Sequence, residues 1–172
     1  MSVLNVERPD FMAEEEIRMF EDMVGRFFEQ NAPPETVEKW REQHFVDRDM
    51  WDKAGEAGLL GLSMPEEFGG AGGDYRHEVV LMEQLAAKGV DGFGISLHNA
   101  IVAPYILHYG TEEQKQRWLP GICSGKYVTA IAMTEPGAGS DLQGVKTSAV
   151  KSGNQYVING SKTFITNGQT AN

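Results

Sequence analysis

The pattern of apolar residues changes near residue 125, and this change constrains the fold more than any other feature of the chain. Before it, apolar residues recur at spacings of three and four, as in residues 17–28, which is typical of helices with one buried face. After it, short β-branched or aromatic segments alternate with Gly, Asn and Ser, which is typical of strands joined by turns. The sequence therefore predicts an α+β protein, with an all-helical domain over residues 1–122 and the start of a β domain over residues 123–172.

Residues that favour the ends of helices predict several boundaries in the first domain. Proline fixes a helical dihedral angle at the first position, Asp and Thr side chains accept hydrogen bonds from free amides there, and glycine favours the left-handed ending. Thr111 opens the stretch TEEQ, a capping box in which Gln114 reaches back. We expect helices to begin near Pro34, Asp74 and Thr111, and to end at Gly58 and at Pro120 with Gly121.

A glycine-rich stretch, GLSMPEEFGGAGGD, occupies residues 61–74. Its density of glycine, together with a proline, predicts a loop. Two interpretations are open: a flexible connection, or backbone that must approach another group closely.

The segment FGISLHNAIVAPYILHY, residues 93–109, is apolar on almost every side. A helix of this character belongs in the middle of a helical domain. Phe93, Leu97 and Ile101 follow one another at four-residue spacing, which places them on one face of that helix. His98 is predicted to be a buried histidine whose hydrogen bonds are satisfied, rather than an acid–base group.

Four short segments after residue 125 are predicted to be strands. In residues 145–151, apolar and polar side chains alternate as in a strand with one buried face. Ser152, Gly153 and Asn154 are turn residues between the second and third segments, and Asn159 and Gly160 suit a tight hairpin turn between two of the strands. The expected strands are residues 127–133, 145–150, 155–160 and 162–167.

Charge, cysteine content and histidine spacing exclude several functional classes. The chain has 25 acidic and 15 basic residues with no Lys/Arg cluster, which argues against nucleic acid or an anionic membrane as a partner. The single cysteine, Cys123, cannot form an internal disulfide. His44, His77 and His108 have no partners at the spacing of metal ligands, so no metal site is expected. No apolar run is long enough for a signal peptide or a membrane span, so an intracellular protein is expected.

The stretch AMTEPGAGSDLQG, residues 132–144, follows an apolar run and contains two closely spaced glycines. It is not a dinucleotide-binding motif, because Leu142 occupies the third glycine position, and it lacks the Gly-Lys-Ser/Thr of a P-loop. Gly137 and Gly139 permit positive φ and leave amides unobstructed, and Ser140 adds a hydroxyl donor. From spacing alone, the loop is either a concave anion site or a decorated β-turn.

A second motif gives this loop a family context. AIAMTEPGAGSD at residues 130–141, followed by NGSKTFITNG at residues 159–168, resembles the flavin-binding signature of the acyl-CoA dehydrogenases. The resemblance extends to PEEFGGAGG and YGTEEQKQRWLP, covers nearly the whole chain, and is greatest with the long-chain branch. It implies an N-terminal helical domain, a β-barrel-like middle domain that binds FAD, and a C-terminal helical domain that is absent from this chain.

In such enzymes the first motif lines the flavin ring and its linker. The resemblance implies that Thr134 bonds the pyrimidine edge, that Ser140 lies where flavin and acyl-CoA meet, and that the Thr166 hydroxyl is directed at N5. Phe164 stands where many members have tryptophan, which keeps a flat apolar surface but loses the indole N–H. The implied cofactor-binding residues are Ile131, Ala132, Met133, Thr134, Glu135, Pro136, Gly137, Ala138, Gly139, Ser140, Phe164, Ile165 and Thr166.

The resemblance also implies a fatty acyl-CoA substrate. Ser140 is implied at the edge of the flavin loop that touches the thioester. Phe93, Leu97 and Ile101 occupy a helix that walls the acyl-chain cavity in the family, and the alternative for each is a plain core role.

The implied reaction is FAD-dependent α,β-dehydrogenation of a fatty acyl-CoA to a trans-2-enoyl-CoA, with electrons passed to electron-transfer flavoprotein. In these enzymes a glutamate beyond Asn172 removes the α proton, so no catalytic residue is expected in this chain and Glu135 is not the base. The chain alone is expected to be an inactive fragment of a homotetramer, located in the bacterial cytoplasm or the mitochondrial matrix. The alternatives are an acyl-CoA oxidase or nitroalkane-oxidase-like flavoenzyme on the same scaffold, and a non-catalytic helical interaction module.

Overall fold

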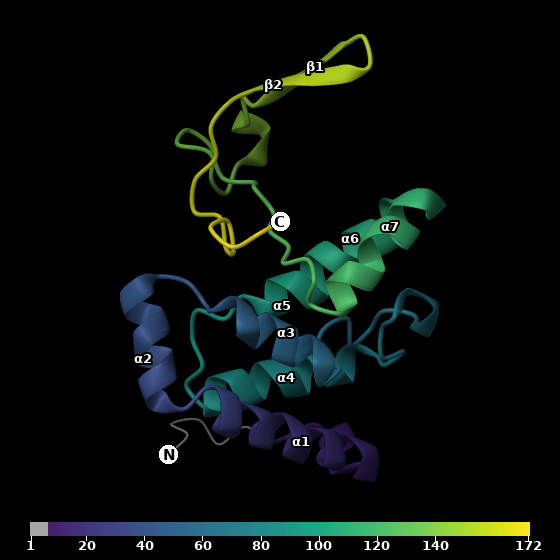
Figure 1. The fold of residues 1–172 in the computed structure, drawn as a ribbon, viewed down its shortest axis with the longest axis vertical. Coiled ribbons are helices and arrows are strands. Elements are labelled where there is room, and N and C mark those ends of the chain that lie inside the picture. Colours follow the sequence, from purple (N-terminus) through teal and green to yellow (C-terminus); the bar gives the residue numbers. More distant parts are fainter. Residues whose placement is uncertain (1–6) are drawn as a thin grey trace.

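The computed structural model describes residues 7–172. Residues 7–123 form a helical body, and residues 124–172 form a smaller region that contains the strands, here called the β region (Figure 1). Residues 1–6, on which part of the signal-peptide expectation rests, lie outside the described residues. The order of helices followed by strands confirms the predicted fold class. The helices are α1 (Glu15–Asn31), α2 (Pro34–Gln43), α3 (Arg48–Glu56), α4 (Tyr75–Ala87), α5 (Ile95–Leu97), α6 (Ala103–Tyr109) and α7 (Glu112–Cys123). Short 3-10 turns lie at Asp10–Ala13, Glu66–Phe68 and Leu142–Gly144, and a π-helical turn at His98–Val102 joins α5 to α6.

An apolar cluster holds the helical body together. α1 packs along α4, and apolar side chains from α1, α2, α3 and α4, Trp51 among them, form one buried cluster. The Trp51 indole is 1% exposed and contacts Phe93 edge-on, with the ring centres 4.8 Å apart. Val128, which lies beyond the last helix, is buried in the same cluster. The core of the helical body therefore includes a residue from the β region.

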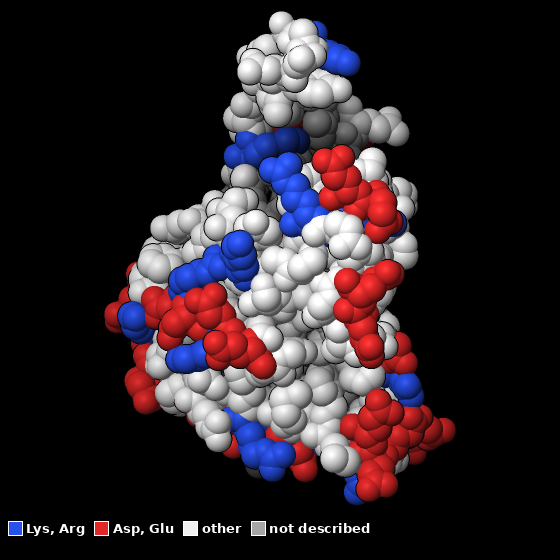
Figure 2. Space-filling model, turned by 45° about the vertical axis from the view of Figure 1, so that its right-hand side comes forward, with Lys and Arg blue, Asp and Glu red and all other residues white. Residues whose placement is uncertain are grey.

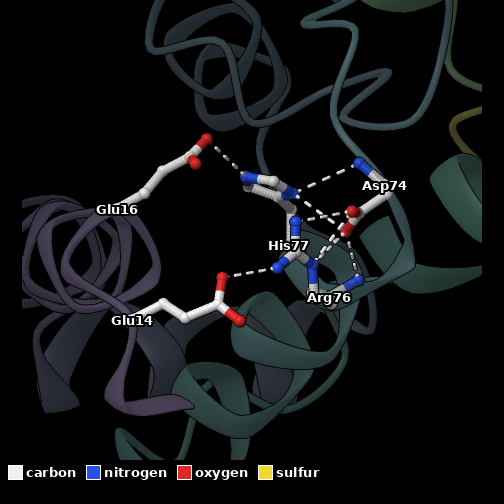
Figure 3. Close-up of polar contacts among 5 residues, drawn as sticks. All are labelled: Glu14, Glu16, Asp74, Arg76 and His77. Atoms are coloured by element: carbon white, nitrogen blue, oxygen red, sulfur yellow. Dashed lines mark hydrogen bonds and ion pairs between the residues drawn. The ribbon is translucent and has the colours of Figure 1, made fainter. Parts of the chain in front are cut away.

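A polar cluster fixes the first turn of α4 against the start of α1. Asp74 caps the helix as predicted, because its carboxylate accepts a bond from the Arg76 amide. The capping box is completed by His77, whose Nδ1 accepts a bond from the Asp74 amide. Figure 3 shows the Arg76 guanidinium between the carboxylates of Asp74 and Glu14, the latter 2.6 Å away. The Arg76 guanidinium, followed by the Arg76 amide, lowers the pKa of Asp74 to about 2.

Other helix ends also follow from single residues. Pro34 begins α2, and Gly58 follows α3 with a φ of 70°, the left-handed conformation that favours glycine. Thr111 forms the predicted capping box with Gln114 at the start of α7. These predictions are confirmed because each depends on contacts within one turn of the chain.

The predicted stop at Pro120 and Gly121 is wrong, because α7 continues to Cys123. Proline removes one hydrogen bond from a helix interior, but tertiary packing can outweigh this local cost. Here Leu119 and Ile122 are buried in a second apolar cluster, which α6 and α7 form together with Met64 and Phe68 of the glycine-rich stretch. This packing holds the last turn of α7 in helical form.

The glycine-rich stretch at residues 61–74 folds back on itself and is not a flexible connection. The Gly73 amide donates to the Leu62 carbonyl at 2.8 Å. A Cβ at Gly70 would lie 2.2 Å from the Met64 carbonyl oxygen, so a side chain is excluded there. Close approach of backbone to backbone is therefore the interpretation that the structure supports.

A buried polar pair fastens this loop to the helices. Asn99, in the π-helical turn, donates to the Leu59 carbonyl at 2.8 Å and accepts from the Gly61 amide at 3.1 Å. The same side-chain nitrogen lies 3.5 Å from the carboxyl group of Glu78, which is fully buried on α4. Burial raises the pKa of Glu78 to about 7, so the neutral acid predominates in the folded protein below pH 7.

The β region contains two of the four predicted strands, which form an antiparallel hairpin that projects from the helical body (Figure 1). Every residue of both strands is exposed, so the prediction of a half-buried strand in residues 145–151 is wrong. Among the described residues the two strands pair only with each other, and residues 127–133 and 162–167 are irregular. The strands are β1 (Ser148–Ser152) and β2 (Gln155–Asn159).

One of the two predicted turns, that at residues 152–154, forms the hairpin, and the other does not. Ser152 pairs with Gln155, which leaves residues 153–154 as the turn, and Gly153 has a φ of 61°. The turn predicted at Asn159 and Gly160 is therefore wrong. Both Gly-Asn and Asn-Gly carry a turn signal, and the pairing of the flanking strands decides which one forms the hairpin.

Charged side chains lie mainly on the helical body. Figure 2 shows acidic side chains gathered there in patches with Lys and Arg among them, whereas the β region at the opposite end carries few charges. No helix in residues 7–172 is both long enough and apolar enough to cross a bilayer. Over the same residues, no group of three His, Cys, Asp or Glu side chains is arranged to hold a metal ion.

Replacing Glu78 with glutamine is expected to remove one pH dependence of stability. The folded pKa of about 7 lies above the ordinary value of 4.5, so the stabilisation is fully present below pH 4.5 and is lost as pH rises through 7. At about 1.36 kcal/mol per pKa unit, this loss amounts to at most about 3 kcal/mol. Glutamine stays neutral, so above pH 7 the Glu78→Gln variant should be more stable than the unchanged protein.

Urea unfolding over this pH range measures the effect. Glu113→Gln, which neutralises an exposed carboxylate on α7, is the matched control. Its free energy of unfolding should change with pH as that of the unchanged protein does. The same pH dependence in Glu78→Gln as in the unchanged protein would contradict the prediction.

Candidate functional site

Residues 131–140 form a loop closed at its centre by a tight turn. The Glu135 amide donates to the Ala138 carbonyl at 2.9 Å, and the Ala138 amide donates back to Glu135 at 3.1 Å. A Cβ added at Gly137 or Gly139 would meet nothing within 4 Å. Neither glycine has a positive φ, so their contribution is open space above the backbone rather than an unusual conformation.

The Glu135 carboxylate is the anchor of this loop. It accepts bonds from the amides of Lys146 at 2.8 Å and Thr147 at 2.9 Å. It also forms an ion pair with the Lys162 ammonium at 2.9 Å, and its side chain is only 7% exposed. Hydrogen bonds from Thr147, the Lys146 amide and the Lys162 ammonium lower the pKa of Glu135 to about 2. A carboxylate so strongly held in its ionised form is a poor proton acceptor near neutral pH.

The structure brings the two predicted flavin motifs together. The Thr163 amide donates to the Thr134 carbonyl at 2.9 Å, and Nζ of Lys162 donates to the Met133 carbonyl at 2.9 Å. Thr134 therefore lies beside the segment that contains residues 164–166. Two stretches that are separated in the sequence by the whole hairpin therefore lie side by side.

Phe164 stands out within the second motif. Its side chain is 89% exposed, and its φ of 54° is an uncommon conformation for a bulky residue. Asn167 follows with its side-chain amide donating to the carbonyls of Gly94 at 3.1 Å and Thr129 at 3.0 Å. The exposed ring is thus held on a backbone that is tied to the helical body. Such a conformation is characteristic of functional loops.

His98 connects the helical body to the β region and is fully buried. Its Nε2 donates to the Ile122 carbonyl at 3.1 Å, and its Nδ1 accepts from the Thr129 amide at 3.2 Å. Burial lowers the pKa of His98 to about 4, so the imidazole is neutral. The prediction of a satisfied structural histidine is confirmed.

The three residues predicted along the acyl chain do not share one helix face. The helix begins at Ile95, so Phe93 precedes it and is buried against Trp51 in the core. Leu97 is half-buried, and Ile101 is 42% exposed beside a surface groove of about 220 Å³. A cavity of about 400 Å³ between α6, α7 and residues 127–130 is lined by none of the predicted site residues.

Two residues that support the site, Lys162 and Asn167, have no role predicted from the sequence. Lys162 bonds the first motif, and Asn167 ties the second motif to the helical body. Both lie within NGSKTFITNG, so the motif itself contained them. Only their long-range partners distinguish them, and no local pattern reveals those partners.

Two family models match successive parts of the chain. A model described as "Acyl-CoA dehydrogenase, N-terminal domain" matches residues 14–126, and one described as "Acyl-CoA dehydrogenase, middle domain" matches residues 130–172. The chain belongs to the acyl-CoA dehydrogenase family. The mitochondrial long-chain specific acyl-CoA dehydrogenase of Mus musculus is 48% identical over 158 residues, covering 92% of this chain and 36% of that protein.

Solved structures of the acyl-CoA dehydrogenase family share the fold. The enzyme from Geobacillus kaustophilus has a TM-score of 0.88 at 48% identity, over 92% of this chain and 41% of that one. A glutaryl-CoA dehydrogenase from Mycobacterium smegmatis in complex with FADH2 has a TM-score of 0.85 at 30% identity, over 94% and 42%. A chain in the structure of the electron transferring flavoprotein of Acidaminococcus fermentans has a TM-score of 0.84 at 42% identity, over 95% and 43%. This chain spans less than half the length of each of these relatives.

Acidification is expected to weaken the folded state through His98. Its folded pKa of about 4 lies below the ordinary value of 6.5, so stabilisation that is present above pH 6.5 is lost as pH falls through 4. At about 1.36 kcal/mol per pKa unit, the loss is at most about 3 kcal/mol. Urea unfolding of the Glu78→Gln variant measures it, because the opposing contribution of that carboxyl group is then absent.

Adding His98→Gln to this background should reduce the pH dependence between 6.5 and 4. His108→Gln, which changes an exposed histidine on α6, is the control and should leave it unaltered. If the free energy of unfolding changes equally with pH in the presence and absence of His98, the protonation of His98 is not coupled to folding.

Proposed function

We propose that this chain contributes the helical domain and the first part of the FAD site to an acyl-CoA dehydrogenase that converts fatty acyl-CoA thioesters to trans-2-enoyl-CoA. The observation that carries the proposal is the contact between the two flavin motifs through the Thr163 amide and the Thr134 carbonyl. Relatives at 48% identity are acyl-CoA dehydrogenases, and one at 30% identity was solved with FADH2. In this proposal the two domains meet between residues 122 and 123.

The residues present fit a flavin. Ser140 and Thr166, which carry hydroxyl groups, are exposed residues, and Phe164 presents an exposed aromatic ring. Gly137 and Gly139 leave open space where a cofactor can approach the backbone. Hydroxyl and amide donors on a fixed loop stabilise charge on a flavin ring without reorganising. When bound, FAD would supply the acceptor for the hydride that leaves the β carbon of the thioester.

Substrate, electron acceptor and assembly belong to the same proposal. Leu97 and Ile101 are proposed to contact the acyl chain, and the long-chain relative supports a long-chain substrate. The Acidaminococcus neighbour supports electron-transfer flavoprotein as the acceptor. The base that removes the α proton is proposed to lie outside this chain, because Glu135 is bonded within its loop. A homotetramer in the bacterial cytoplasm or the mitochondrial matrix completes the proposal.

The full encoded protein is expected to purify with FAD, and long-chain acyl-CoA added without oxygen should bleach its visible absorption. Thr134→Val and Thr166→Val should each slow this bleaching by roughly 5- to 10-fold, since one hydrogen bond contributes about 1 kcal/mol. Ser148→Ala removes an exposed hydroxyl on β1 and should leave the rate unchanged. Stopped-flow absorbance measures each rate.

Three other outcomes would favour the rival functions. A protein without flavin that is indifferent to these substitutions would favour a helical interaction module. Flavin that is reduced by acyl-CoA and reoxidised by oxygen with release of peroxide would favour an acyl-CoA oxidase. Reduction by a nitroalkane but not by acyl-CoA would favour a nitroalkane-oxidase-like enzyme.

A further inference from the structure

Glu135 has no polar group left for a ligand. Its amide and carbonyl are both paired with Ala138, and its carboxylate is occupied by two amides and the Lys162 ammonium. Nearly the whole side chain is buried. The sequence motif places Glu135 among the cofactor-binding residues, but the structure leaves it only an indirect part in such binding.

Lys162 contacts the first motif at a second point besides its ion pair with Glu135. Its Nζ also donates to the Met133 carbonyl, and the next amide, that of Thr163, donates to the Thr134 carbonyl. Two adjacent residues of the second motif therefore bond three consecutive residues of the first. Contacts at consecutive positions fix both the register and the rotation of one segment relative to the other, which a single contact does not.

The same ion pair closes the base of the hairpin. Lys146 and Thr147 precede β1, whereas Lys162 follows β2, and all three bond the Glu135 carboxylate. Among the described residues after residue 130, Glu135 and Ala138 alone are buried. This polar centre thus takes the place that an apolar core occupies in the helical body.

We infer that Glu135 and Lys162 are positioning residues for the FAD site: their ion pair holds Thr134 and residues 164–166 at the separation that the cofactor requires. The inference rests on the proposed function. It concerns residues that bind each other rather than the cofactor. Removal of either partner leaves a largely buried charge uncompensated, whereas removal of both does not. The two residues should therefore behave as a coupled pair.

A double-mutant cycle in the full encoded protein tests the inference. FAD dissociation constants are measured by quenching of flavin fluorescence for Glu135→Gln, Lys162→Met, the double variant and Lys162→Arg. Each of the first two should bind FAD at least roughly tenfold more weakly, and the double variant no more weakly than the weaker single. Lys162→Arg keeps the charge and should recover most of the affinity. Lys151→Met, an exposed lysine on β1, is the matched control and should bind as the unchanged protein does.

Hydrogen exchange of the Thr163 amide in the FAD-free protein gives a readout that needs no cofactor. Its exchange should accelerate at least roughly tenfold in Lys162→Met and stay unchanged in Lys151→Met, because its acceptor on Thr134 is held in place by the neighbouring pair. Unchanged exchange would overturn the inference.

The remaining outcomes separate the inference from the proposed function. If the unchanged protein binds FAD and the single variants bind it equally tightly, the inference is overturned and the proposed function stands. If the unchanged protein binds no FAD, both fail. Loss of the helical circular dichroism signal in a single variant would also overturn the inference, because the pair would then be a general requirement for folding.

Discussion

The neutral imidazole of His98 joins the two parts of the molecule, and the orientation of the candidate site depends on it. Its ring nitrogens bond in opposite directions, one to the end of α7 at Ile122 and the other to Thr129 at the start of the β region. Asn167 bonds the carbonyl of Thr129 and also that of Gly94. Both motifs are thus placed relative to the helices by a few directional hydrogen bonds between buried or half-buried groups. Such networks fix geometry more narrowly than apolar contact does.

The two regions are stabilised by different physical means. In the helical body, tryptophan and phenylalanine rings from several helices pack into a continuous apolar cluster. The hairpin has no such layer, and all ten of its strand positions are exposed, five in each strand. Its base is instead closed around the carboxylate of Glu135. The loop that carries the proposed function therefore depends on charge and backbone geometry, while the helices depend on burial.

Local chemistry made much of the helical body predictable from the sequence. The caps at Asp74 and Thr111 were predictable because they involve neighbouring residues. The continuation of α7 through Pro120 was not, because the packing that holds the last turn comes from residues distant in sequence. Of the two turns predicted after residue 150, the one at residues 152–154 joins paired strands, whereas the one at Asn159 and Gly160 does not, because residues 162–167 form no strand to pair across it.

The same distinction holds within the candidate site. The motifs named the candidate residues, but the left-handed backbone of Phe164 and the partners of Lys162, which lie across the hairpin, follow from no local pattern. The burial of Val128 in the helical core has a consequence for how the chain is made. A chain emerging from the ribosome cannot complete that core when α7 has been synthesised, since one of its side chains is still to come. The boundary proposed between residues 122 and 123 is therefore not the boundary of the unit that folds.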